Sequence, residues 1–438
     1  MTGAARATDA GGPGLQSLPL ASPSRWLVLA LLVLGYALYN LDKSIIAIMI
    51  EPLKAEFGLG DRQISLLSAG MTLPIAIFCI PMGRMIDRVN RKVMVALLVI
   101  GWSAMTGLSG LANSIALLGV ARGGVGAFES GYTPASMSLL ADEFPPQRRP
   151  TAMGFFNLGS PVGICLGMAI GGLVAAQWGW RAAFFAASLP GLLLGLIILL
   201  FVREPERGRF DQEAAGAERT GLGRALAIWW AKKPSRYAGL GMIFAAVLLS
   251  ATSIWTPALL SRVQGLGIAQ AGLYTAFIVG ICGSLGAATG GLLADRIGRN
   301  RESRKLLVPS AGLALSAVAG LAGYLLVLPL APMVALLSLS SFFASSYAGP
   351  GYAAALGFIP SHIRGTIASV LLLCFGVISY GTGTMIVGFV SDQLPASVGV
   401  RAVALGVASA LPFSLVGAGF FAAAYRELRK TERDSGRA

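Results

Sequence analysis

Long apolar runs, separated by short charged turns, fill most of the chain. A helix needs about 20 mostly apolar residues to cross a bilayer, and runs of this length predict spans near 25–50, 63–83, 91–112, 115–140, 150–176 and 181–202. A charged stretch from Arg203 to Arg236 follows, and further spans are predicted near 237–262, 268–293, 304–327, 331–358, 364–391 and 399–425. The pattern therefore predicts about twelve membrane helices, arranged as six plus six.

Two charged turns repeat at a constant distance along the chain. The first reads G-R-M-I-D-R-V-N-R-K from Gly83 to Lys92, and the second reads G-L-L-A-D-R-I-G-R-N-R from Gly291 to Arg301. An offset of 208 residues relates Gly83, Asp87, Arg88 and Arg91 to Gly291, Asp295, Arg296 and Arg299. An offset near half the chain length indicates a duplicated unit, and repeats of apolar segments are typical of secondary transporters.

Composition and charge place the chain in a lipid bilayer. Its 438 residues are 55% hydrophobic and 12% charged, whereas a soluble protein has about 25% charged residues. The net charge of +14 first suggests nucleic acid, but the cations sit in short turns on alternate sides of the apolar runs, which argues against such a partner. With the N-terminus in the cytoplasm, 27 of the 34 Lys and Arg lie inside and five lie outside. We expect a multi-pass protein of a bacterial inner membrane with both termini cytoplasmic.

These patterns predict an all-α membrane protein built from two pseudo-symmetric six-helix bundles. We expect a disordered tail at 1–24, an N-terminal bundle at 25–203, a cytoplasmic linker at 204–236, a C-terminal bundle at 237–426 and a tail at 427–438. In the fifth span, glycines recur every four residues at Gly159, Gly163, Gly167 and Gly171. This spacing puts them on one helix face, where a neighbouring backbone can approach closely.

Polar residues gather in every third span, the first, fourth, seventh and tenth. A three-helix unit used about four times around a wet central cavity explains this period. The residues predicted to line the cavity are Tyr36, Asn40, Phe128, Tyr132, Thr133, Phe156, Ser253, Trp255, Ser346, Tyr347, Phe375 and Tyr380. The alternative is that the hydroxyls bond their own helix backbone and that the aromatic rings only pack, which explains some of the residues but not their period.

Four ionisable residues lie at membrane depth: Asp42, Lys43, Arg122 and Glu129. A charge at the bilayer centre costs about 2.5–3.5 kcal/mol on insertion scales, so such residues mark ion or substrate paths. Counted along their spans, Asp42 and Arg122 lie level and can pair if their helices are neighbours. Burial favours the protonated form of a carboxyl group, and a nearby guanidinium favours the ionised form. We predict that Asp42 and Glu129 exchange protons and that Arg122 is the switch; the alternative is a fixed ion pair that holds two helices together.

The repeated turns predict a gate on the cytoplasmic side. An Asp at the end of a span can cap a neighbouring helix and pair with Arg across an interface. We expect Asp87 and Asp295, with the glycines and arginines of the same turns, to hold the cytoplasmic side shut and to separate when it opens. Simple anchoring by positive charge explains the arginines but not the matched Gly and Asp.

The turns resemble the signature loop of the major facilitator superfamily, and the resemblance covers nearly the whole chain. Within the N-terminal half, R-G-G-V-G-A-F-E-S from Arg122, P-A-S-M-S-L-L-A-D-E-F-P-P-Q-R-R from Pro134 and G-W-R-A-A-F from Gly179 resemble the spinster-type lipid transporters. Asp42-Lys43 stands where that family usually has Asp-Arg. The resemblance implies alternating access by two rocking halves and an amphipathic substrate, since the family carries sphingosine-1-phosphate and lysophospholipids in animals.

We therefore predict a monomeric, proton-coupled transporter of an amphipathic, lipid-like small molecule. An uncoupled facilitator and a drug or organic-anion transporter of the same fold are alternatives, and a lipid sensor is a further one. An embedded enzyme is disfavoured because one loop histidine, His362, and four scattered cysteines provide neither a nucleophile with its base nor a metal set. No metal or cofactor is expected.

Overall fold

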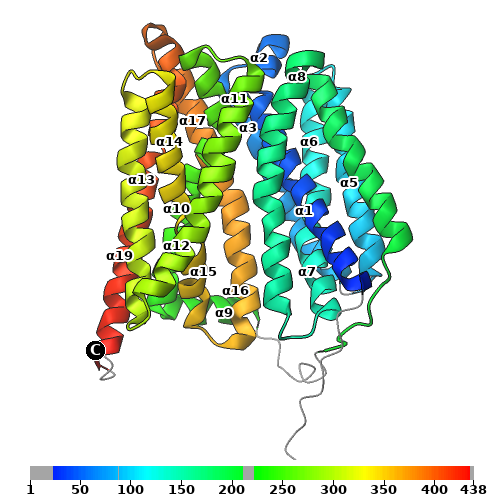
Figure 1. The fold of residues 1–438 in the computed structure, drawn as a ribbon, viewed down its shortest axis with the longest axis vertical. Coiled ribbons are helices and arrows are strands. Elements are labelled where there is room, and N and C mark those ends of the chain that lie inside the picture. The colour runs from blue at the N-terminus through cyan, green and yellow to red at the C-terminus, as the bar shows by residue number, and fades with distance from the viewer. Residues whose placement is uncertain (1–22, 87, 211–220, 435–438) are drawn as a thin grey trace, which may run out of the picture.

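The computed structural model describes residues 23–86, 88–210 and 221–434, and they form an all-helical bundle (Figure 1). The N-terminal half contains α1 (Pro23–Ile48), α2 (Ile50–Phe57), α3 (Asp61–Gly70), α4 (Thr72–Ile86), α5 (Arg91–Gly110), α6 (Ile115–Glu129), α7 (Tyr132–Glu143) and α8 (Arg149–Phe201). Residues 1–22 of the predicted tail 1–24, residues 211–220 of the predicted linker 204–236, residues 435–438 of the predicted tail 427–438, and Asp87 lie outside the described residues.

The C-terminal half follows a short helix, α9 (Leu222–Ala231). It contains α10 (Lys233–Gln264), α11 (Ile268–Thr275), η2 (Ala276–Cys282), α12 (Gly283–Ile297), η3 (Glu302–Leu306), α13 (Leu307–Leu325), α14 (Leu330–Ser345), α15 (Ala348–Gly357), α16 (Ser361–Cys374), η4 (Phe375–Tyr380), α17 (Gly381–Gln393), η5 (Ala396–Arg401), α18 (Ala402–Ala408) and α19 (Leu411–Asp434). Two of these segments, η2 and η4, are π-helical turns inside longer helices.

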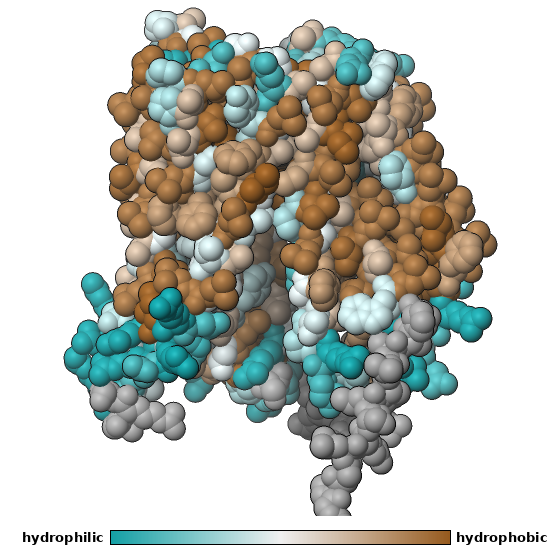
Figure 2. Space-filling model, in the orientation of Figure 1, coloured by the Kyte–Doolittle hydropathy of each residue, from teal (hydrophilic) through white to brown (hydrophobic). Residues whose placement is uncertain are grey.

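The structure confirms the predicted membrane helices. Ten segments of the described chain are long and apolar enough to cross a membrane. One of them, Arg149–Phe201, contains two predicted spans, and Gly179 separates these with a φ of 83°. The remaining predicted span, 115–140, is built from α6 and α7, which are 15 and 12 residues long. Apolar side chains cover the sides of the bundle, and hydrophilic residues gather at its ends (Figure 2).

The glycine face of the fifth span packs α8 against α1, as its spacing predicts. A Cβ atom at Gly159 would lie 2.6 Å from the carbonyl oxygen of Val33, and one at Gly163 would lie 2.0 Å from that of Ala37. Only glycine allows backbones to approach this closely. The contact fixes α1, which provides Asp42 and Lys43, against a rigid neighbour.

The two halves touch at one end of the bundle and separate at the other. We call the end that carries the C-terminus the inner end, after the orientation that the charge bias predicts, and the opposite end the outer end (Figure 1). Toward the outer end, α8 meets α11, where a Cβ at Gly272 would lie 2.4 Å from the carbonyl oxygen of Met168. Figure 2 shows a hollow between the halves that opens toward the inner end. With the two ends named in this way, the arrangement is inward-open.

Candidate functional site

Asp42 and Arg122 form a buried ion pair between α1 and α6. Their closest atoms, Oδ1 and a guanidinium nitrogen, are 3.2 Å apart, and the side chains are 4% and 1% exposed. Arg122 also donates to the backbone carbonyl of Asp42 at 3.1 Å, and Thr106 donates to the other carboxylate oxygen at 2.8 Å. The structure therefore brings together the two residues that were predicted, by counting along their spans, to lie at the same depth in the membrane.

Glu129 is more isolated than Asp42. Its side chain is fully buried, and neither carboxylate oxygen has a hydrogen-bond partner in the structure. Its one ion-pair contact among the described residues is with Lys43, at 3.8 Å. An ionised carboxylate in such surroundings is unstable unless it is paired, so the charge state of Glu129 depends on the position of the Lys43 ammonium.

Lys43 lies between Glu129 and the space that separates the halves. Its side chain is 25% exposed, and its ammonium donates to the Tyr39 hydroxyl and lies 4.0 Å from the centre of the Tyr39 ring. Tyr380, at the end of η4 in the C-terminal half, is 36% exposed and lies within electrostatic range of Lys43. The coupling candidates of one half thus approach the opposite half through Lys43.

An aromatic group lies beside these charges. Tyr36 stacks on Phe156 with ring centres 4.6 Å apart, and on Tyr39 at 5.6 Å. Tyr132 is fully buried and donates to the carbonyl of Leu32 at 2.7 Å. The partly exposed rings of Tyr36 and Tyr39 form an aromatic wall next to the Lys43 cation, whereas Phe156 and Tyr132 are fully buried.

The other residues predicted for the cavity lie in two kinds of position. Asn40, Thr133, Ser253 and Phe375 are partly exposed, and Asn40 accepts a hydrogen bond from Ser160 at 3.0 Å. Phe128 is also partly exposed and packs against Gly101. The rest are buried between helices: Trp255 with its indole N–H 3.2 Å from the Thr384 carbonyl, Ser346 against Gly312, and Tyr347 beside Phe421.

A cluster of charges at the outer end joins the halves, and sequence reasoning missed it. Arg262, near the end of α10, donates to the two carboxylate oxygens of Asp61 at 2.6 and 2.7 Å and to Glu51 at 2.8 Å. Lys54 also donates to Asp61. From α17, Asp392 caps the start of α3 by accepting the N–H groups of Asp61 and Arg62 at 3.0 and 2.8 Å.

The sequence does contain an indication of this cluster, but a count of the charges on each side of the membrane does not reveal it. Arg262 and Lys54 read as outer cations, but Asp61 begins the second span just where Arg262 ends the seventh. Charges at matching ends of neighbouring helices can pair across them. Finding the pair requires knowing that these helices are neighbours, and a single sequence does not give that.

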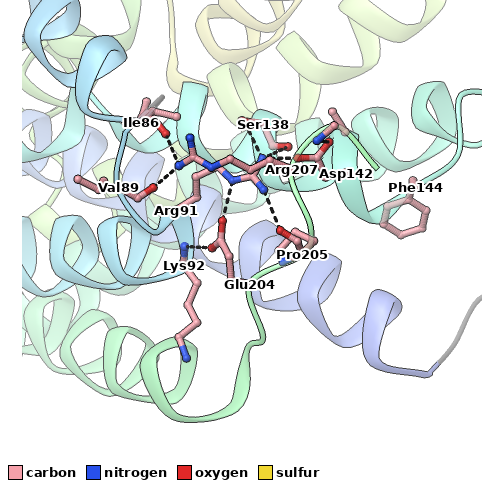
Figure 3. Close-up of polar contacts among 12 residues, drawn as sticks. Ile86, Val89, Arg91, Lys92, Ser138, Asp142, Phe144, Glu204, Pro205 and Arg207 are labelled. Atoms are coloured by element: carbon pink, nitrogen blue, oxygen red, sulfur yellow. Dashed lines mark hydrogen bonds and ion pairs between the residues drawn. The ribbon is translucent and has the colours of Figure 1, made fainter. Parts of the chain in front are cut away.

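At the inner end, the first repeated turn is tied within its own half (Figure 3). Arg91 donates to Asp142, to Glu204 at 2.8 Å and to the Ser138 hydroxyl at 3.1 Å. Glu204 also accepts the backbone N–H of Lys92 at 2.7 Å. The turn is thus fixed to the ends of α7 and α8.

The second repeated turn is looser. Asp295 has an 80% exposed side chain and contacts Lys305 at 3.8 Å. Arg296 and Arg299 are exposed, as is Arg88 in the first turn, whereas Gly83 and Gly291 are partly buried. In this inward-open arrangement no hydrogen bond or ion pair of these residues crosses between the described parts of the two halves, so their part in closing the inner end stays a prediction.

Residues that ligate metals are scattered in the described part of the chain, where no group of three or more His, Cys, Asp or Glu could hold a metal ion. The four cysteines form no disulfide within the described residues and are partly buried in separate helices. Between the charged clusters at the two ends of the bundle, the ionisable groups that gather are those of α1 and α6.

Comparison with known proteins identifies the family. The family model of the Major Facilitator Superfamily matches residues 32–384. A Mycolicibacterium smegmatis protein named as an MFS-type efflux pump is 31% identical over 383 residues, which are 86% of this chain and 87% of that protein. A Danio rerio sphingosine-1-phosphate transporter is 30% identical over 239 residues, which are 53% of this chain and 47% of that protein.

A solved structure is similar over almost the entire chain. It is a bacterial homologue of the human lysosomal transporter Spinster in an inward-facing, unoccupied conformation, with a TM-score of 0.85, 27% identity, and coverage of 93% of this chain and 98% of that one. This chain therefore belongs to the Major Facilitator Superfamily, and it is a spinster-like transporter that works by alternating access, not an enzyme.

Proposed function

We propose that the protein is a proton-coupled secondary active transporter of an amphipathic, lipid-like small molecule. One observation supports the coupling most: the Glu129 carboxylate is fully buried, lacks a hydrogen bond and has Lys43 as its ion-pair contact among the described residues. When Lys43 turns toward the cavity, an unpaired carboxylate is left in an apolar environment, and proton uptake becomes favourable there.

Asp42 is the second proton carrier in this proposal, and Arg122 is the switch. In the inward-open state Arg122 forms an ion pair with Asp42. A rocking movement that shifts α6 against α1 would weaken this pair, after which Asp42 can accept a proton. The alternative of a fixed ion pair requires that the Asp42–Arg122 contact persists through the cycle.

The partly exposed aromatic rings beside Lys43 support this substrate class. The partly exposed rings of Tyr36 and Tyr39, which stack on each other, can receive an apolar chain, and Lys43 can receive an anionic head group. A sphingosine-1-phosphate transporter among the relatives fits this class, whereas the relative named as an efflux pump fits the alternative of a drug or organic-anion substrate.

We place the protein in a bacterial inner membrane as a monomer with both termini in the cytoplasm. The bias of Lys and Arg toward the inner end supports this orientation. Residues 25–203 and 237–426 are proposed as the two moving bundles, and 204–236 is proposed as the linker between them.

Uptake into proteoliposomes under an imposed pH gradient tests the proposal. A panel of lysophospholipids, sphingosine-1-phosphate and organic anions identifies the cargo, and proton movement on adding cargo separates coupling from facilitation. Asp42→Asn and Glu129→Gln should abolish gradient-driven accumulation, while Glu427→Gln, which removes an acidic residue of α19 that pairs with Lys430, should not. Full accumulation by Asp42→Asn would reject the mechanism, and binding without movement would indicate a sensor.

A further inference from the structure

The inner end of the C-terminal half contains an open pocket of about 630 Å³, which is within the range of small-molecule sites. The turn between α12 and η3, together with α15 and α19, forms its walls. Arg299, Arg301 and Lys305 lie on one wall, and Pro350, Ala353, Ala354 and Gly357 lie on another. It is separate from the aromatic wall and the buried charges described above, because none of those residues lines it.

Matched hydrogen bonds show which residues of the two halves correspond near this pocket. In the N-terminal half, Arg149 Nε donates to the carbonyl of Phe144 at 3.2 Å. In the C-terminal half, Arg364 Nε donates to the carbonyl of Ile359 at 3.2 Å. The donors and the acceptors are both 215 positions apart, so this offset superimposes the ends of α7 and α15.

The same offset matches both α7 partners of Arg91 with residues of the pocket wall. Asp142 corresponds to Gly357, and Ser138 corresponds to Ala353. Gly357 and Ala353 have no side-chain acceptor. The C-terminal half therefore lacks the oxygen atoms that bind a guanidinium in the N-terminal half (Figure 3).

The third partner of Arg91, Glu204, has a counterpart in the C-terminal half, Glu432, which makes different contacts. Glu204 accepts the N–H of the second residue of α5, and Glu432 accepts the N–H of Ser303, the second residue of η3, at 2.8 Å. Glu432 also accepts the Ser303 hydroxyl at 2.6 Å. The remaining carboxylate of the pocket, Glu302, accepts Lys305 at 2.9 Å.

Two arginines of the pocket have no acidic partner among the described residues. Within the described chain, neither Arg299 nor Arg301 has a carboxylate within ion-pair distance. A Cβ atom at Gly357 would meet nothing within 4 Å. The space that a carboxylate fills in the N-terminal half is thus empty in the C-terminal half, and arginines face it.

We propose that this pocket binds a phosphate group, held by Arg299, Arg301 and Lys305. Planar guanidinium groups bind phosphate oxygens in pairs, and the bound anion would join the turn to α15 and α19 as Asp142 joins the first turn to α7. The phosphate is the head group of an anionic phospholipid of the inner leaflet or a soluble phosphate ester. The proposal does not depend on proton coupling.

Thermal unfolding of the full chain in neutral detergent tests the site. Inorganic phosphate and sn-glycerol 3-phosphate are titrated at constant ionic strength against chloride, and lipid nanodiscs containing phosphatidylglycerol are compared with phosphatidylcholine alone. A ligand of the folded state raises the midpoint in a saturable way. A response to phosphatidylglycerol alone assigns the lipid head group, and a response to the soluble esters alone assigns a soluble ligand; both support the site.

Variants show whether the response comes from this pocket. Arg299→Gln with Arg301→Gln should weaken the apparent affinity at least about tenfold, because each charged hydrogen bond contributes about tenfold or more. Arg426→Gln with Arg429→Gln removes two exposed arginines of α19 and should leave it unchanged. Gly357→Asp should raise the midpoint without phosphate and reduce the phosphate response. No response in any arm, or an equal response in the Arg299 and Arg301 double variant, overturns the proposal.

Discussion

The Arg262 cluster should set the balance between the inward-open and outward-open states. Arg262 connects α10 to α3 and α2 of the other half through three hydrogen bonds of 2.6 to 2.8 Å. Asp61 is 3% exposed, Arg262 is 16% exposed and Glu51 is 39% exposed. The Asp61 contact therefore contributes most, since solvent screens Glu51.

The size of the shift between the two states depends on the contacts that Asp61 keeps after Arg262→Gln. Removing one partner of a buried charge pair costs about 2–5 kcal/mol. Asp61 keeps Lys54 and the Ser391 hydroxyl as donors, so the loss should lie near about 2 kcal/mol at the low end of that range. This corresponds to a shift of about 30-fold in the equilibrium. An outward-open state populated at about 1% would rise to about a quarter.

Electron–electron distance measurements can detect this shift. Spin labels at Leu111 and Val327, which are 63% and 83% exposed at the outer end of each half, should report one short distance in the parent protein with its native cysteines replaced. A second, longer distance should appear in Arg262→Gln and in Asp61→Asn, and the double variant should resemble the single ones. Arg181→Gln removes a similar contact, with Glu56 at 2.6 and 2.9 Å, inside one half and should not change the distances. Identical distributions in Arg262→Gln and the parent would refute the reasoning.

Two further predictions concern stability. Gly163→Ala should lower the free energy of unfolding by about 1–3 kcal/mol, because its Cβ would lie 2.0 Å from the Ala37 carbonyl; Gly154→Ala, which meets open space on the same helix, should be neutral or stabilising in the same thermal assay. Hydrogen bonds from Arg181 hold the pKa of Glu56 below its usual range, so the contact stabilises the fold above the unfolded-state pKa of about 4.3 and is lost as pH falls through the folded-state value. The midpoint difference between the parent and Glu56→Gln should therefore be constant near neutral pH and shrink below about pH 4; a difference that grows in acid contradicts this.

Local patterns were sufficient to predict the helices and part of the site. Apolar length gives the spans, and a four-residue glycine period gives the close contact of α8 with α1. Asp42 and Arg122 could be paired because depth along a span is a matter of counting residues. Counting residues could not show which carboxylate contacts Lys43, since that contact depends on how far each helix is rotated about its axis.

Cross-half contacts lay beyond the sequence for a different reason. Asp392 and Asp61 are 331 positions apart, and both read as solvated charges at helix ends. Their contact depends on the packing of α3 against α17 in one state of the cycle. A residue that acts in only one state has no fixed local pattern to reveal it.

The two ends of the bundle use similar ion pairs for opposite purposes. At the outer end, Arg262 crosses between the halves and holds them together. At the inner end, Arg91 binds Asp142 and Glu204 inside one half, so its charges do not oppose opening. To close the inner end, contacts across the halves must form without giving up this internal network, because breaking a buried arginine pair is costly. The exposed charges at Arg88, Arg296 and Asp295 are free of that constraint, which makes them better candidates for the closing contact than Arg91.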